Sequence, residues 1–175
     1  MPTLPLYISP PCPNAWHRVL SPGGYERWHF DAEDAASDTI VVIDFFDGVT
    51  FDEDYLRRYQ AYRRRSRQNA PPTPREYPGI YIAVSKGGKT ILEKMLRFPA
   101  GAFEGSVERP TFSIARSGVT LGQAGAYRVR VEDQERGWAA DLTLTPRLAH
   151  SAAERATQPR EPGVARHFWV VAAPL

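Results

Sequence analysis

Short runs of β-branched and aromatic residues, separated by turn residues, make up most of the chain after its proline-rich start. The run 25–31 alternates, with Glu26, Trp28 and Phe30 on one face, as expected of a half-buried strand. The run 39–46 is almost continuously apolar, which predicts a strand covered on both faces. Further strands are predicted at residues 79–84, 90–96, 111–114, 127–131, 138–144 and 167–171. The pattern therefore predicts an all-β fold, an antiparallel barrel or sandwich of about eight strands.

One segment departs from the strand pattern. Residues 52–65 begin with acidic residues and end with arginines, which suits the dipole of a helix, and a Pro-Pro pair follows. On this inserted helix Tyr55, Tyr59 and Tyr62 share one face. Its arginines suit either a phosphate-binding surface or a solvated helix face, and the acidic residues nearby favour the solvated face. These arginines are Arg57, Arg58, Arg63, Arg64, Arg65 and Arg67.

The first 24 residues form a separate, proline-rich region. Five of the 16 prolines lie within the first twenty residues, which excludes a regular helix or a central strand there. We therefore expect residues 1–24 to be an extended lead-in. The single cysteine, Cys12, lies in it and has no partner for an internal disulfide, so the fold needs no oxidising compartment.

Composition narrows the class of protein. The chain has 175 residues, of which 42% are hydrophobic, and a formal net charge of +2. This length fits one domain with its own core. The charge is too small for a surface that follows nucleic-acid phosphates, so no nucleic-acid partner is expected. No segment approaches the roughly 18 apolar residues of a membrane span, and no signal peptide is visible. We expect a soluble, cytoplasmic protein.

Motifs of common enzyme classes are absent from the sequence. It contains no G-x-S-x-G elbow, no phosphate-binding loop and no G-x-G-x-x-G after a strand. The four histidines lack the spacing of a metal site. His29 and Asp31 share a strand face, but an ordinary hydrogen-bonded or exposed pair is the favoured interpretation. We therefore expect neither a metal nor a cofactor.

Two carboxylates on predicted strands are the candidate catalytic residues. Asp44 interrupts an apolar strand, and Glu26 shares a face with Trp28 and Phe30. If either side chain points inward, desolvation would raise its pKa and let it donate a proton near neutrality. The alternative is a structural carboxylate that accepts hydrogen bonds or pairs with an arginine.

Aromatic residues on the predicted strands provide the candidate binding site. Trp28, Phe46, Tyr81 and Trp138 either line a cavity for an apolar ligand or fill the core. An eight-stranded barrel has room for one small ligand, so the two uses are compatible.

Residues 24–32 read G-Y-E-R-W-H-F-D-A, which resembles the G-Y-E-W-W-Y-F-D-A opening of the family that contains carotenoid hydratases, AttH-like proteins and lipocalin-like Diels-Alderases. The segment 167–174 resembles the end of that family's first domain. Arg27 and His29 stand where the family pattern has tryptophan and tyrosine. The resemblance implies a lipocalin-like (calycin) β domain over residues 25–175. The family's second domain is then absent, and another chain or copy is expected to supply it.

The resemblance also implies a function. We expect a cofactor-independent, Diels-Alderase-like cyclase of natural-product biosynthesis, or the N-terminal half of one, which folds an apolar polyene in a β-barrel pocket. Glu26 or Asp44 would donate a proton or hydrogen bond, and the four aromatic residues would bind the substrate. The acid residues of the family's hydratases belong to the second domain and are not transferred. The alternatives are an acid-assisted hydratase of an isoprenoid and a non-catalytic carrier of a hydrophobic small molecule.

Overall fold

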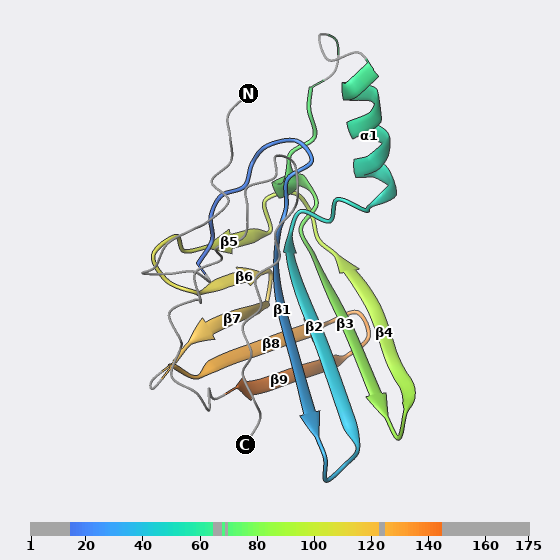
Figure 1. Ribbon diagram of the computed structural model, residues 1–175, viewed down its shortest axis with the longest axis vertical. Coiled ribbons are helices and arrows are strands. Elements are labelled where there is room, and N and C mark those ends of the chain that lie inside the picture. The colour runs from blue at the N-terminus through green and yellow to red at the C-terminus, as the bar shows by residue number, and fades with distance from the viewer. Residues whose placement is uncertain (1–14, 65–67, 69, 123–124, 145–175) are drawn as a thin grey trace, which may run out of the picture.

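The computed structural model describes residues 15–64, 68, 70–122 and 125–144. This part of the chain folds into two antiparallel sheets, each with its strands in chain order. The first sheet contains β1 (Glu26–Asp34), β2 (Thr39–Asp47), β3 (Gly79–Lys86) and β4 (Lys89–Arg97). The second contains β5 (Phe103–Gly105), β6 (Phe112–Ile114), β7 (Ser117–Leu121), β8 (Tyr127–Asp133) and β9 (Trp138–Leu144). The strands of the second sheet run across those of the first (Figure 1).

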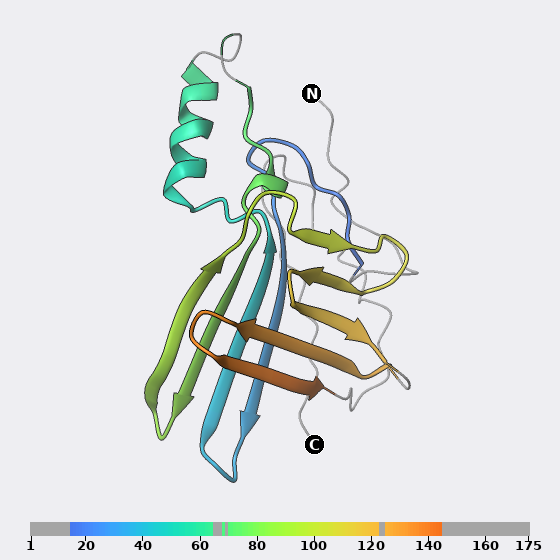
Figure 2. The same ribbon diagram turned by 180° about the vertical axis from the view of Figure 1, so that it is seen from behind.

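The all-β antiparallel fold with one inserted helix is confirmed. Helix α1 (Glu53–Arg64) and the short 3-10 helix η1 (Pro74–Glu76) lie in the connection between β2 and β3. Figure 2 shows α1 beyond one end of the four-stranded sheet. Two strands of the described part, β5 and β7, were not predicted. The predicted strand at 167–171 lies outside the described residues.

The turn between β3 and β4 follows from its two glycines. Gly87 and Gly88 have φ angles of 57° and 70°, as a two-residue hairpin turn of type I′ requires. In the β1–β2 pair, Phe30 lies opposite Ile43 and His29 lies opposite Asp44. This register decides which side chains meet on each face of the sheet.

The two sheets enclose a core filled by their own side chains. On β2, Ile43 and Phe45 are fully buried in this core, while Asp44 and Phe46, which alternate with them, point to the other face of the sheet. The core also includes Trp16, Trp28, Ile80, Ile82, Phe103, Phe112, Ile114, Val119, Val129, Val131 and Leu144.

The described residues do not form the expected hollow interior between the two sheets. The Trp28 ring lies 5.5 Å from that of Phe103 and 4.4 Å from that of Phe112, centroid to centroid. Phe45 also contacts Phe112, at 5.3 Å. Large aromatic side chains from both sheets therefore occupy the space that an enclosed ligand would need.

Helix α1 is attached to the β domain through its first turn. The Asp52 carboxylate accepts a hydrogen bond from the backbone N–H of Asp54 at 2.8 Å, which caps the helix. The Tyr55 hydroxyl accepts one from the Gly23 N–H at 2.6 Å. Tyr59 stacks on Tyr55, which confirms the predicted tyrosine face. Neither this helix nor any other in the described residues is long and apolar enough to cross a membrane.

Candidate functional site

A groove lies on the outer face of the four-stranded sheet, on the side opposite the core. Its volume is about 600 Å³. Strands β1 to β4 and the segment after β2 all contribute side chains, because residues two apart on a strand share a face. The lining residues are Tyr25, Arg27, Asp44, Phe46, Thr50, Phe51, Tyr81 and Met95.

The walls of the groove are mostly apolar. Phe46 is buried and meets Phe51 edge to face, with 5.6 Å between ring centroids. Phe51 is nevertheless 56% exposed, so much of its ring faces solvent. On the other side, Tyr81 and Met95 are opposite each other across β3 and β4. These side chains offer an apolar surface that solvent reaches from outside.

An ion pair forms the polar part of the groove. Arg27 donates two hydrogen bonds to Asp44, from Nε to Oδ1 at 2.8 Å and from Nη2 to Oδ2 at 2.9 Å. The Asp44 side chain is 6% exposed, whereas that of Arg27 is 32% exposed. Arg27 also lies over the Phe46 ring, with 5.9 Å from Cζ to the centroid. A two-pronged pair of this kind fixes both side chains.

His29 contacts the same carboxylate from β1. Its Nδ1 lies 2.7 Å from Asp44 Oδ1 and 3.1 Å from Arg27 Nη2. The carboxylate is an acceptor, so the close contact assigns the Nδ1 proton to the hydrogen bond with Asp44. The Nε2 atom lies 3.7 Å from Asp31. Asp44 thus accepts hydrogen bonds from the guanidinium of Arg27 and the imidazole of His29. This agrees with the alternative stated above, in which the carboxylate pairs with an arginine.

Tyr81 presents its ring to the groove while its hydroxyl is engaged elsewhere. The hydroxyl donates to Glu93 Oε1 at 3.0 Å. Burial raises the pKa of the Tyr81 phenol, and the Glu93 hydrogen bond and the charge of Asp44 raise it further. The phenol therefore remains protonated at neutral pH and bound to Glu93.

The structure brings together three of the six predicted site residues, namely Asp44, Phe46 and Tyr81. Trp28 lies in the core between the sheets, and Trp138 packs against the same core from β9. The Trp138 Nε1 is buried and has no hydrogen-bond partner among the described residues. The binding roles given to Trp28 and Trp138 stay predictions.

Glu26 lies away from the groove, on the core side of β1. Its carboxylate accepts hydrogen bonds from the backbone N–H groups of His17 at 2.8 Å and Val19 at 3.0 Å. It also contacts His17 Nδ1 at 3.0 Å. These contacts hold the segment before β1 against the sheet, as the structural interpretation of this carboxylate requires. Its catalytic role stays a prediction.

Sequence reasoning missed a second buried carboxyl group beside Glu26. Asp47 lies opposite Glu26 in the β1–β2 pair and is fully buried. Its Oδ2 accepts a hydrogen bond from Trp16 Nε1 at 2.7 Å, and its Oδ1 has no partner among the described residues. Burial raises the pKa of Asp47 to about 6. The hydrogen bond from Trp16 and the charge of Arg75 oppose this shift, whereas the charge of Glu26 adds to it. An aspartate at the end of an apolar run was the available signal.

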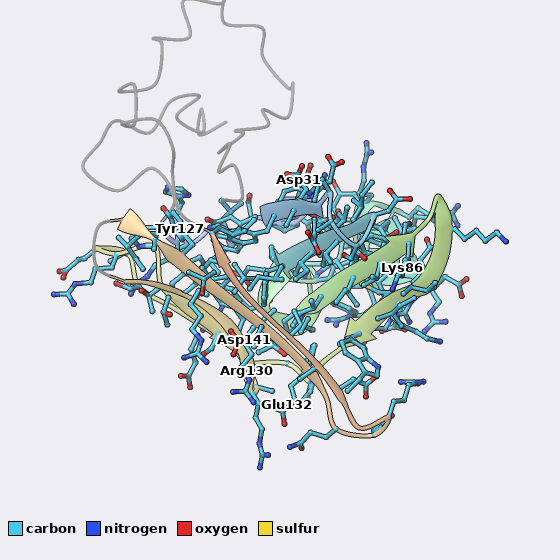
Figure 3. All side chains as sticks on the ribbon, turned by 90° about the horizontal axis from the view of Figure 1, so that it is seen from below. Asp31, Lys86, Tyr127, Arg130, Glu132 and Asp141 are labelled. Carbon is cyan, nitrogen blue, oxygen red and sulfur yellow. The ribbon has the colours of Figure 1, made fainter. Side chains whose placement is uncertain are left out.

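The outer face of the other sheet has a different character. Arg128 pairs with Asp141 at 2.6 Å, and Arg130 pairs with Glu132 at 3.0 Å. Figure 3 shows Arg130, Glu132 and Asp141 together on the side of the five-stranded sheet that faces away from the four-stranded one. Within the described residues, no group of three or more His, Cys, Asp or Glu side chains could hold a metal ion. The outer face of the five-stranded sheet thus carries these ion pairs, whereas the outer face of the four-stranded sheet carries the mostly apolar groove.

Comparisons with known proteins found one region of similarity. The hydroxyneurosporene dehydrogenase of Chlorobaculum tepidum is 37% identical over 78 residues, which are 45% of this chain and 20% of that protein. The chain thus spans about a fifth of the length of the curated relative it matches. No family model matches the chain, and no solved structure matches it.

Proposed function

We propose that this chain is an isoprenoid-binding β domain that acts in carotenoid or related polyene metabolism. The name of the similar protein supports the ligand class, because hydroxyneurosporene is a carotenoid. The resemblance of residues 24–32 to a family that contains carotenoid hydratases agrees with it. The observation that carries the proposal is the groove, in which aromatic side chains and Met95 surround a single ion pair.

The size and lining of the groove suit one section of a polyene. Its volume of about 600 Å³ is within the usual range for small-molecule sites. Apolar walls with few polar groups are typical of such sites, and exposed aromatic faces gain most when an apolar chain covers them. Phe51, which is 56% exposed, would gain the most burial.

For the reaction we propose cyclisation of the bound polyene. A groove that holds reacting carbons in contact supplies most of what such a reaction needs. Asp44, with Arg27 and His29 beside it, would polarise the ligand, since these three groups form a fixed electrostatic cluster. Acid-assisted hydration of an isoprenoid at the same cluster is the alternative. Carriage without catalysis is the second alternative, and it needs only the apolar walls.

Binding can be tested through the NMR signal of one methionine methyl group. The chain has two methionines, Met1 and Met95, and Met95 lines the groove. In protein labelled with methyl-13C methionine, the isoprenoids farnesol, farnesene and farnesoic acid should shift the Met95 methyl signal and leave that of Met1 unchanged. Phe51→Ser should weaken binding about tenfold, because the ring loses its apolar contact with the ligand. Leu121→Ser, on the five-stranded sheet, is the matched control. A Met95 signal that none of the three compounds moves would overturn the proposal.

A second experiment distinguishes an enzyme from a non-catalytic carrier. Wild-type protein is incubated with an acyclic carotenoid, and products are identified by chromatography and mass spectrometry. If the domain is an enzyme, Asp44→Asn should lower turnover with affinity largely retained, and Glu26→Gln tests the other predicted acid in the same way. Glu33→Gln, an exposed carboxyl group on β1, is the control. A carrier binds the ligand and forms no product with any of these proteins.

Two further expectations stay predictions. One is that another chain or copy supplies a second β domain, which sedimentation of the purified protein would detect as a dimer or larger assembly. The other is the cytoplasmic location, which fractionation of the producing cells would check.

A further inference from the structure

We infer that the Arg27–Asp44 pair makes the groove selective for an isoprenoid that carries a neutral hydroxyl group, over the matching hydrocarbon and the matching carboxylate. The inference rests on the proposed function, because it concerns which isoprenoid the same groove prefers. It comes from the hydrogen-bonding capacity that the ion pair leaves unused in a mostly apolar groove.

The ion pair leaves one donor group and one acceptor available. Arg27 uses Nε and Nη2 for Asp44, and within the described residues its Nη1 has no partner. Asp44 Oδ1 accepts from Arg27 and contacts His29, whereas Oδ2 accepts, among the residues that the structure describes, only from Arg27 Nη2. Each carboxylate oxygen has two acceptor sites. A ligand hydroxyl group can donate a hydrogen bond to Oδ2 or accept one from Arg27 Nη1.

A pure hydrocarbon does not satisfy these groups. When a hydrocarbon covers the pair, water is removed from Arg27 and Asp44 and no hydrogen bond replaces it. Most of the lost hydration is that of Arg27, the more exposed partner, whose side chain is 32% exposed. Sites that are built to hydrogen-bond a hydroxyl group discriminate strongly against analogues that lack it.

A carboxylate is disfavoured for a different reason. The positive charge of Arg27 is already compensated by Asp44, whose oxygens lie 2.8 and 2.9 Å from it. Glu93, which accepts the Tyr81 hydroxyl, adds a second carboxyl group beside the groove. A ligand anion would therefore lie near two carboxylates and a guanidinium that is already paired, and it would also lose its own hydration.

The test compares three ligands with the same carbon skeleton. Farnesol, farnesene and farnesoic acid are titrated into wild-type protein at pH 7.5, and dissociation constants are taken from the Met95 methyl shift. Farnesol should bind at least about tenfold more tightly than either of the others. Equal affinities for farnesol and farnesene, or tighter binding of the acid, would overturn this inference and leave the proposed function standing. If none of the three binds, both fail.

A paired variant tests the source of the selectivity. Arg27→Met combined with Asp44→Leu replaces the ion pair by apolar side chains of similar size, a change that folded proteins generally tolerate. In this variant farnesene should bind at least as tightly as in the wild type, and the preference for farnesol should fall below about threefold. Arg130→Met with Glu132→Leu, the corresponding pair on the outer face of the other sheet, is the control. A preference for farnesol that survives in the Arg27/Asp44 variant would overturn the assignment to this pair.

Discussion

The buried carboxyl group of Asp47 should make the protein less stable at neutral pH than in mild acid. Its pKa is raised from 3.8 to about 6 in the folded state, mainly because burial disfavours the charged form. The folded protein then binds this proton more tightly than the unfolded chain. The stabilising contribution is fully present below pH 3.8 and is lost as the pH rises through about 6. Asp47→Asn, which keeps an acceptor for Trp16, removes the charge at every pH.

The size of the effect follows from the two pKa values. Their difference, from 3.8 to about 6, corresponds to about 3 kcal/mol, since one pH unit is worth about 1.4 kcal/mol. At pH 8 the wild type should therefore be less stable than Asp47→Asn by up to about 3 kcal/mol. At pH 4 most of this difference should vanish.

Urea unfolding followed by circular dichroism at pH 4, 6 and 8 measures the difference directly. Glu33→Gln, on the same hairpin and exposed, serves as the control and should change the free energy of unfolding by no more than about 0.5 kcal/mol at any of these pH values. The reasoning is refuted if the gap between wild type and Asp47→Asn is the same at pH 4 and pH 8. It is also refuted if Asp47→Asn is the less stable protein at pH 8.

Three further substitutions test the fold. Asp52→Ala should cost about 1–2 kcal/mol in urea unfolding, because the backbone N–H of Asp54 loses its cap, and Asp52→Asn should recover most of it. Phe103→Ala should cost about 3–5 kcal/mol, seen as a lower thermal midpoint, because this fully buried ring fills the space between the sheets. Tyr55→Phe should cost about 1 kcal/mol in the same assay, because the Gly23 N–H loses its acceptor.

The sequence predicted the long strands and the helix because their side-chain patterns are local. It did not predict β7, which contains Gly118, a residue that normally argues against a strand. The glycine is needed here: a Cβ atom on it would lie 2.6 Å from the carbonyl oxygen of Phe112 on the neighbouring strand. Strand β5 has three residues, too few for an alternation to be recognised. Both strands depend on their neighbours and not on their own pattern.

The site was predicted only in part for a related reason. Asp44 was found because a carboxylate in an apolar strand is unusual, and Phe46 and Tyr81 because they are aromatic. The pairing of Asp44 with Arg27 and His29 depends on the β1–β2 register, which puts His29 opposite Asp44. An almost continuously apolar run such as 39–46 does not reveal which of its faces meets the core. The sequence therefore singled out Asp44 but left open which face of the sheet it occupies, and its catalytic role stays a prediction.

The groove separates the proposed binding residues from the core residues within a single strand. On β2, Ile43 and Phe45 fill the core, and Asp44 and Phe46 line the groove, so neighbouring residues serve different purposes. A filled core keeps the sheet rigid, and a rigid sheet fixes the register that pairs Arg27 with Asp44. Groove substitutions such as the Arg27/Asp44 pair can therefore alter which ligand binds while the core contacts remain. In the proposed binding role, this arrangement lets the groove residues change without changing the fold.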